Sequence, residues 1–334
     1  MLNWLSEFYW SKNKETTRLV DQFLLENFSE YGGLAFHLKR RKQTSQTKIK
    51  SFFVRMGYEI GSGGENRLDD IIPLCSMVEL LNVGNYIIER SIDENNKDFS
   101  KLGYKIRELV LNSEFIDGDE REIFKSIIKD TNDYLYLDNS FLVLKDPLVS
   151  KDEFMGIYEK KCCLVGGNVY SNCLKLGYLK SRNSDSTILH HLSKIGLIFG
   201  TAYQMVHDIA DLLPEELKRF QEDFKYYQKQ YNSIRKKKLT LPIFFAMYEW
   251  TDIDKKKLLH MIEKCNYQFI TKLFLEKKIV KKSKTFIGDY LKKSNKSFYY
   301  LPKNDWVDCL KFGINAVNSN VFWKHFKKLY AEIA

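Results

Sequence analysis

The sequence is poor in residues that interrupt helices and in patterned cysteines. It has five prolines and 17 glycines among 334 residues, which leaves long stretches without a helix breaker. Its six cysteines stand at no spacing typical of a metal site, and a chain of this length does not need disulfide bonds. These scarcities exclude a disulfide-rich scaffold and a cysteine-ligated metal site, so we expect free thiols in a core.

Long uncharged apolar runs are also absent. No stretch of about 18 such residues occurs, and 29% of the residues are charged, so we expect no membrane span. The first residues already include Glu7 and Glu15, which does not fit a signal peptide, and we expect a cytoplasmic protein. Because 44% of the residues are hydrophobic and 14% are aromatic, the chain can bury a large core.

Charge of one sign is in excess. The net charge of +10 is compatible with nucleic acid, an anionic membrane surface or phosphorylated small molecules as partners. Four basic runs lie inside or beside helical patterns, with no glycine-rich or RNA-binding aromatic motif nearby: Lys39–Lys42, Arg235–Lys238, Lys277–Lys284 and Lys324–Lys328. We interpret these runs as solvated faces and predict no nucleic-acid partner.

Hydrophobic periodicity predicts an all-α protein. Six segments carry apolar residues at about i, i+3, i+4 and i+7: Thr16–Phe28, Pro73–Arg90, Asp119–Asp130, Leu189–Leu213, Leu241–Tyr248 and Lys255–Lys272. Connections are expected at Gly61–Asn66, Asp93–Asp98, Asn112–Gly118, Lys145–Asp152, Ser181–Ser186 and Leu212–Glu215. Tyr134–Leu144 alternates like a strand, but a single strand has no partner for its backbone. We expect one all-helical domain over 1–334, with 291–334 as a terminal helical extension.

A polar, acidic stripe marks one of these helices. Gly200–Asp211 reads GTAYQMVHDIAD, and its polar members stand at i, i+3, i+4 and i+7: Gln204, His207, Asp208 and Asp211. Such a stripe is unfavourable to bury unless it binds something. Carboxylates one turn apart suit hard divalent cations such as Mg2+, which also bind substrate phosphates.

A second acidic turn lies upstream, where Glu89 and Asp93 stand at i and i+4 on the apolar helix Pro73–Asp93. Two such helices facing one cavity could hold a diphosphate through bridging Mg2+ ions. An alternative is an ordinary solvated helix end, in which Arg90 forms an ion pair within the helix.

These motifs resemble those of the trans-polyprenyl diphosphate synthases over roughly residues 20 to 290. Gly200–Asp211 is similar to the family's second motif, G-x-x-F-Q-x-x-D-D-x-x-D, and Glu79–Ile88 followed by Glu89–Asp93 stands where the first aspartate-rich motif belongs. Lys161-Cys-Cys-Leu resembles the K-T-x-x-L segment, and Lys237–Pro242 resembles G-K-x-T-L-P. Lys48-Ile-Lys50 lies near the place of the family's basic G-K-R-x-R-P sequence.

The resemblance implies an antiparallel helical bundle around a central apolar cavity, of the isoprenoid synthase type. It also implies four carboxylate metal ligands, Glu89, Asp93, Asp208 and Asp211. Diphosphate contacts would come from Arg90, Lys161, Lys238, Lys48 and Lys50. Gln204 would lie beside the isoprenoid, and the small Gly84, with Asn85, would leave room for a longer product tail unless an aromatic such as Tyr86 closes it.

The chain departs from the family at two motif positions, because Arg90 stands in place of one acid and His207 in place of another. Both changes remove negative charge from the implied metal site. His207 remains a candidate ligand, although imidazole suits softer metals better than Mg2+. The arginine could bind phosphate oxygens without a metal.

Two function classes follow. In the first, the protein is a prenyltransferase that ionises allylic prenyl diphosphates with Mg2+ or Mn2+ at an altered metal site and condenses or transfers the isoprenoid chain. In the second, it is a catalytically impaired partner subunit of a heteromeric prenyl diphosphate synthase, with metal binding weakened or lost. The expected assembly is a homodimer or a heterodimer with another prenyl synthase subunit.

Overall fold

A computed structural model describes residues 2–31, 34, 48–64, 68–140, 150–210, 238, 240–264 and 266–319. None of these segments forms a strand, and helices account for most of their length. The predicted all-α class is therefore confirmed. The alternating residues from Tyr134 onward belong to a helix that continues to Ser140.

Backbone contacts divide the chain into two compact units, each built from separated segments. The first unit comprises Met1–Asp133, Asn168–Leu197 and Ser294–Gly313, and the second comprises Tyr134–Gly167, Ile198–Lys293 and Ile314–Ala334. Three helices pass from one unit into the other: α6 (Gly118–Ser140), α9 (Ser186–Ala210) and α16 (Asp305–Ser319). Neither unit is a continuous stretch of sequence, and the single domain stays a prediction.

The first unit contains parts of these three helices and six further elements: α1 (Leu2–Phe28), α3 (Ile49–Ser62), α4 (Leu68–Glu94), α5 (Lys97–Leu111), α8 (Asn168–Lys180) and the 3-10 turn η3 (Asn295–Tyr300). Helices α3 and α8 pack at very short range through glycines. A Cβ on Gly57 would lie 2.2 Å from the Leu174 carbonyl oxygen, and one on Gly177 would lie 1.8 Å from that of Val54. Only residues without a side chain permit this approach.

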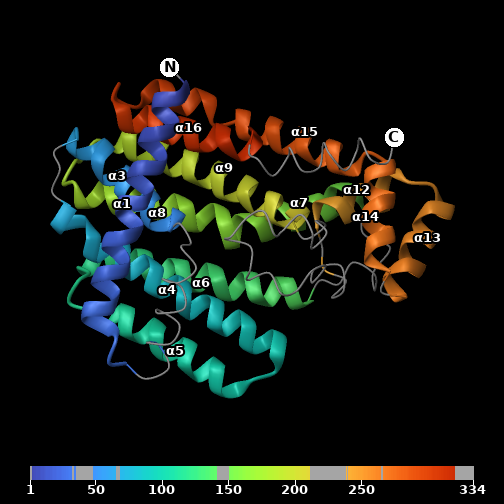
Figure 1. Ribbon diagram of the computed structural model, residues 1–334, viewed down its shortest axis with the longest axis horizontal. Coiled ribbons are helices and arrows are strands. Elements are labelled where there is room, and N and C mark those ends of the chain that lie inside the picture. Colours follow the sequence, from blue (N-terminus) through green and yellow to red (C-terminus); the bar gives the residue numbers. More distant parts are fainter. Residues whose placement is uncertain are drawn as a thin grey trace. The chain divides into compact units, whose positions relative to one another are not determined.

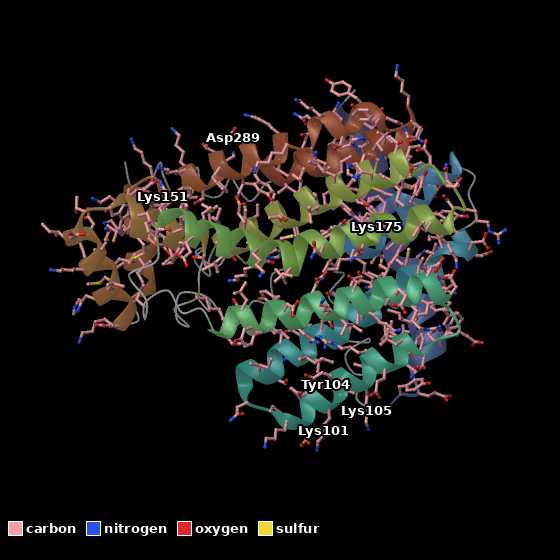
Figure 2. The ribbon with its side chains drawn as sticks, turned by 180° about the vertical axis from the view of Figure 1, so that it is seen from behind. Lys101, Tyr104, Lys105, Lys151, Lys175 and Asp289 are labelled. Atoms are coloured by element: carbon pink, nitrogen blue, oxygen red, sulfur yellow. The ribbon has the colours of Figure 1, made fainter. Side chains whose placement is uncertain are left out.

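Helix α4 is the apolar centre of the first unit. Leu68–Ile92 is long and apolar enough to cross a membrane, with a mean hydropathy of 1.5. However, 78% of its apolar 18-residue stretch is buried inside the structure. It is therefore the core helix of a folded unit, and it is the one such helix among the described residues. Helix α5 runs beside it (Figure 1). Figure 2 shows the outer face of α5, from which Lys101, Tyr104 and Lys105 point away.

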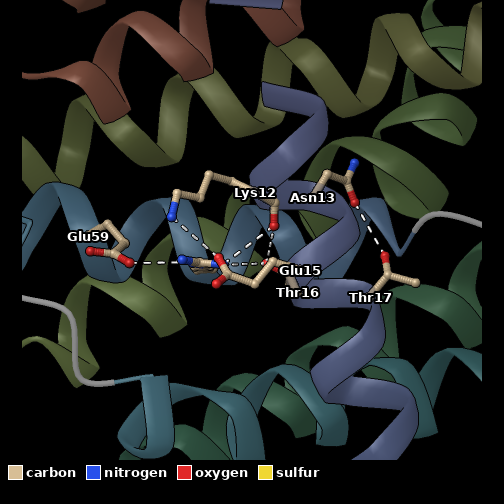
Figure 3. Close-up of polar contacts among 7 residues, drawn as sticks. Lys12, Asn13, Glu15, Thr16, Thr17 and Glu59 are labelled. Carbon is tan, nitrogen blue, oxygen red and sulfur yellow. Dashed lines mark hydrogen bonds and ion pairs between the residues drawn. The ribbon is translucent and has the colours of Figure 1, made fainter. Parts of the chain in front are cut away.

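A buried ion cluster ties three helices of the first unit together. The Arg55 guanidinium on α3 is fully buried and pairs with Glu15 of α1 (2.8 Å) and with Glu59 one turn along α3 (3.3 Å). It also donates to Thr16 (3.1 Å) and lies 5.1 Å from the ring centroid of Trp306 on α16. Figure 3 shows Glu15, Thr16 and Glu59 around this point, which we call the Arg55 cluster.

The second unit contains the remaining parts of α6, α9 and α16 and six further elements: α7 (Lys151–Cys162), the π-helical turn η1 (Cys163–Gly167), α12 (Leu241–Glu249), α13 (Asp252–Glu263), α14 (Tyr267–Glu276) and α15 (Ile279–Lys292). Helix α12 packs on α7 and α15. The ring centroids of Phe244 on α12 and Phe154 on α7 lie 5.4 Å apart. Side-chain caps on Ser150 and Thr240 fix where α7 and α12 begin.

The predicted helices are confirmed over their described residues, with one exception. The expected continuous helix Lys255–Lys272 is wrong, because α13 ends at Glu263 and the Asn266 side chain accepts a hydrogen bond from the Phe269 amide to start α14. The connections predicted between α4 and α5, α5 and α6, and α8 and α9 are present. The end of the predicted helix at Leu213 and the connection Leu212–Glu215 lie outside the described residues. So do parts of the connections Gly61–Asn66 and Lys145–Asp152.

Candidate active site

Two lysines predicted to contact a diphosphate meet at one buried carboxylate in the second unit. Asp138, near the end of α6, is 4% exposed. Its Oδ1 atom lies 2.9 Å from Nζ of Lys161 on the last turn of α7, and its Oδ2 atom accepts a hydrogen bond from Nζ of Lys238. Lys161 is 4% exposed and Lys238 is 9% exposed. The fold thus brings together two cations that are far apart in sequence, and we call this trio the Asp138 cluster.

The charges of the Asp138 cluster support one another. Burial opposes ionisation of Asp138, but the ammonium groups of Lys161 and then Lys238 outweigh it and hold the pKa of Asp138 below its ordinary value. Burial likewise disfavours a charged Lys161, but Asp138 and then Asp208 raise the pKa of Lys161 above its ordinary value. Asp138 and Lys161 are therefore both charged at neutral pH, as a buried ion pair requires.

Asp208, the best-placed acid of the second predicted motif, is also buried in this unit, at 5% exposure on α9. Its Oδ2 atom accepts a 2.7 Å hydrogen bond from the phenol of Tyr158, which stands one turn before Lys161 on α7. Burial and then the charge of Asp208 raise the pKa of Tyr158 well above its ordinary value, so the phenol keeps its proton and donates.

A π-helical turn and two glycines set the local geometry around Gln204. The turn η1 follows Lys161 and Cys162 directly, and π-helical turns occur frequently at functional sites. A Cβ on Gly166 would lie 2.2 Å from the carbonyl oxygen of Gly200 and 3.3 Å from Cβ of Gln204. The small residues therefore let η1 approach α9 at the start of the predicted motif, with Gln204 against it.

His207 packs against an aromatic ring of its own helix. Its ring packs edge-on against Tyr203, with 4.7 Å between ring centroids, and both are half-buried. Burial raises the pKa of Tyr203 to about 12. Asp211 lies outside the described residues. Among the residues that the structure describes, no group of three or more His, Cys, Asp or Glu side chains is placed to hold a metal ion.

The first predicted motif lies on α4, in the first unit. Glu89 and Arg90 are half-buried, and the Arg90 guanidinium lies 5.9 Å from the ring centroid of Phe99 on α5. The backbone of Asp93 belongs to the last turn of the same helix. Since Asp208 belongs to the second unit, the joining of the two acidic turns around one diphosphate stays a prediction.

The two lysines near the amino end have partners within the first unit. Lys48 is buried and forms a 2.8 Å ion pair with Asp21 of α1. Lys50 donates a hydrogen bond to Asn82 of α4. These contacts hold both lysines within the first unit, and their contact with a diphosphate stays a prediction.

Gly84, which the resemblance places where product length is set, packs closely against α5. A Cβ at this position would lie 3.1 Å from the Gly103 carbonyl oxygen and 3.1 Å from Ile106 Cγ2, so α5 fills the space that the missing side chain leaves. Tyr86 is 52% exposed, and the role of both residues in setting product length stays a prediction.

Asn85 belongs to a polar network rather than to an open surface. It accepts a hydrogen bond from Arg107 Nε (2.8 Å) and donates one to Thr131 Oγ1 (3.2 Å). Arg107 also donates to Asn132 (2.7 Å), and burial lowers the pKa of this guanidinium. The network joins α4, α5 and α6 and gives Asn85 a packing role within the first unit.

Sequence reasoning missed Asp138 and Tyr158, the two residues that contact Lys161, Lys238 and Asp208. A signal for Asp138 was present, because Thr131, Tyr134, Leu135 and Asp138 stand at i, i+3, i+4 and i+7 and all are buried. Extending the helical pattern beyond Asp130 places this acid on the buried face, where a charge needs a partner. Tyr158 carried no such signal, since buried tyrosines are common in cores.

Comparison with solved structures identifies the fold. Heptaprenyl diphosphate synthase from Staphylococcus aureus superposes with a TM-score of 0.75 at 14% identity, over 92% of this chain and 98% of that one. Geranylgeranyl pyrophosphate synthetase from Pyrococcus horikoshii gives a TM-score of 0.73 at 18% identity, over 94% of this chain and 99% of that one. A polyprenyl synthase from Caulobacter crescentus was solved with calcium and isoprenyl diphosphate. It gives a TM-score of 0.73 at 14% identity, over 96% of this chain and 98% of that one.

The chain has the fold of the polyprenyl diphosphate synthases. No protein-family model and no curated protein sequence matches it. The polyprenyl synthase fold is thus retained at a sequence identity so low that the likeness concerns architecture alone, and the chemistry must be argued from the side chains.

Proposed function

We propose that this protein binds allylic prenyl diphosphates and condenses or transfers the isoprenoid chain by metal-assisted ionisation of the diphosphate. The observation that carries the proposal is the convergence of Lys161, Lys238 and Asp208 in the buried part of one unit. The polyprenyl synthase fold supports it, as does the Caulobacter crescentus neighbour that was solved with calcium and isoprenyl diphosphate.

In this mechanism the two lysines bind the diphosphate and stabilise the negative charge that develops when the carbon–oxygen bond breaks. Preorganised cations in a buried site are effective at this task, because no solvent must reorganise around the leaving group. Gln204 would lie beside the isoprenoid, and Arg90 would add a planar donor for phosphate oxygens.

Carboxylates suit a hard cation such as Mg2+, and we propose those of the two predicted motifs as its ligands: Asp208, Glu89, Asp93 and Asp211. A bound divalent cation would neutralise diphosphate charge and ease its departure. His207 fits Mg2+ poorly, and Mn2+ would tolerate this imidazole better. We therefore propose an altered metal site with weaker Mg2+ affinity.

A second candidate function is that of an impaired partner subunit in a heteromeric prenyl synthase. The observation that favours it is that the charged groups already have partners. Asp138 forms ion pairs with both lysines, and Asp208 accepts a hydrogen bond from Tyr158. Together with the loss of acids at 90 and 207, this pairing would reduce metal binding. Such a subunit would form a heterodimer with an active synthase, whereas the enzyme would act as a homodimer.

The deciding experiment incubates the purified protein with farnesyl or geranyl diphosphate, isopentenyl diphosphate and Mg2+ or Mn2+, and analyses the products. We expect product formation, and a loss on the order of 100-fold in Lys161→Met, because one preorganised cation is removed. Lys160→Met is the matched control, since Lys160 is the exposed neighbour on α7 and its loss should change turnover less than about twofold.

The outcomes separate the two candidate functions. Product formation that is equal in Lys161→Met and wild type would contradict the proposed site. No product with either metal, combined with activation of a second prenyl synthase subunit on mixing, would establish the partner function instead. Failure to bind any prenyl diphosphate would contradict both.

A further inference from the structure

The Asp138 cluster has a composition that the implied reaction does not explain. The diphosphate is an anion, yet the two lysines proposed to bind it share a buried carboxylate that is 4% exposed. A carboxylate near an anion site would repel the ligand, so its presence needs a physical reason.

The geometry supplies that reason. Lys161 approaches Oδ1 of Asp138 and Lys238 approaches Oδ2, so one rigid, planar group holds two ammonium groups on neighbouring oxygens. A phosphoryl group also presents neighbouring oxygens to its donors. Because an ammonium carries three N–H donors, Asp138 can hold each lysine without using all of them.

We propose that Asp138 is a positioning residue that presents Lys161 and Lys238 as a preformed pair to one phosphoryl group of the substrate. This inference rests on the proposed function. Asp138 itself does not touch the substrate, and it acts by fixing where the two flexible side chains end. Because the two lysine side chains are ordered before binding, their loss of conformational entropy does not weaken binding of the ligand.

The absence of Asp138 would have two consequences. Two buried ammonium groups would repel each other, and each would lose the partner that compensates for its desolvation. Asparagine at this position keeps the size of the side chain but replaces one oxygen with an NH2 donor, so one of the two lysines loses its acceptor.

The test measures binding of inorganic diphosphate to the full-length protein by calorimetry, without divalent cations, in a double-mutant cycle. We expect Asp138→Asn to weaken binding on the order of tenfold. In the background of Lys161→Met with Lys238→Met, the same substitution should cause no further loss, because Asp138 acts only through these lysines. A general structural role would produce the same loss in both backgrounds.

Two further variants control for charge and for rescue. Asp133→Asn removes an exposed acid from the same helix and should leave the affinity unchanged. Asp138→Glu keeps two acceptor oxygens and should recover most of the affinity. Unchanged or tighter binding in Asp138→Asn, with wild-type protein that binds diphosphate, would overturn the positioning role and leave the proposed function standing. Wild-type protein that binds no diphosphate would overturn both.

A spectroscopic measurement on wild-type protein covers the case in which Asp138→Asn does not fold. The Nζ signals of Lys161 and Lys238, assigned through the single methionine variants, should appear as protected ammonium groups in 15N-labelled protein. Adding diphosphate should shift both signals together. A shift of one signal alone, or of neither, would overturn the proposal.

Discussion

The Arg55 cluster of the first unit and the Asp138 cluster of the second are both buried ion clusters, but their centres have opposite charge. In the Arg55 cluster one guanidinium serves two acids, Glu15 and Glu59. In the Asp138 cluster one carboxylate serves two ammonium groups. The pKa values follow this difference, because burial outweighs Arg55 and raises the pKa of Glu59, whereas the lysines outweigh burial and lower that of Asp138.

The two clusters also differ in how firmly their cations are held. Arg55 lies in the middle of α3 and is fixed by its planar fork and by the ring of Trp306. Lys161 stands at the end of α7 and Lys238 just before α12, and both are flexible alkyl ammonium groups. An arginine whose fork pairs with two acids suits a structural joint, whereas lysines, each with three N–H donors, suit a site that must also bind a ligand.

The largest effect is expected from Arg55→Met. Removing the guanidinium leaves Glu59 buried without its partner, so the free energy of unfolding should fall by about 3–5 kcal/mol. Urea unfolding measures this change. Lys14→Met, an exposed position on α1, should change the same quantity by less than about 0.5 kcal/mol. A loss below about 1 kcal/mol in Arg55→Met would show that the cluster is not the structural joint we describe.

A smaller effect is expected from Tyr158→Phe, which tests whether the second unit depends on its own polar contacts. Loss of the hydrogen bond to the buried carboxylate of Asp208 should lower the free energy of unfolding by about 1.5–3 kcal/mol. Tyr136→Phe is the control, because that tyrosine is 76% exposed on α6. Equal stability of the two variants would mean that Asp208 does not need its phenol partner.

The smallest effect is a difference in pH dependence between the two clusters. The folded pKa of Asp138 is below its unfolded value of about 3.9, so its contribution to stability is present above that value and is lost as the pH falls through the folded pKa. The folded pKa of Glu59 is above its unfolded value of about 4.3, so folding gains stability as the pH falls through that raised pKa.

Unfolding measured from about pH 7 down to about pH 3 should therefore show opposite trends against two variants. The advantage of wild type over Asp138→Asn should shrink toward the acid end, whereas wild type should gain relative to Glu59→Gln as the pH falls toward that end. Each pH unit between the folded and unfolded pKa changes the free energy of unfolding by about 1.4 kcal/mol. Parallel curves for the two variants would remove the electrostatic distinction between the clusters.

Much of the fold could be predicted because helical periodicity is a local property. The apolar pattern of Pro73–Arg90 anticipated α4, and the motif Gly200–Asp211 anticipated the end of α9 as far as Ala210. The break before Asn266 was missed, since the apolar pattern continues across it. A new helix starts there because the Asn266 side chain accepts a hydrogen bond from the Phe269 amide.

The sequence by itself determined the all-helical class and the positions of the chemically distinctive residues, such as Lys161, Lys238 and Asp208. Helical periodicity and motif positions are both properties of the order of residues along the chain. Only the tertiary structure decided their partners: Asp138 between the two lysines, Tyr158 on Asp208, and α5 against Gly84. The reason is that periodicity tells which face of a helix is buried, whereas a contact between residues far apart in sequence depends on how the helices pack.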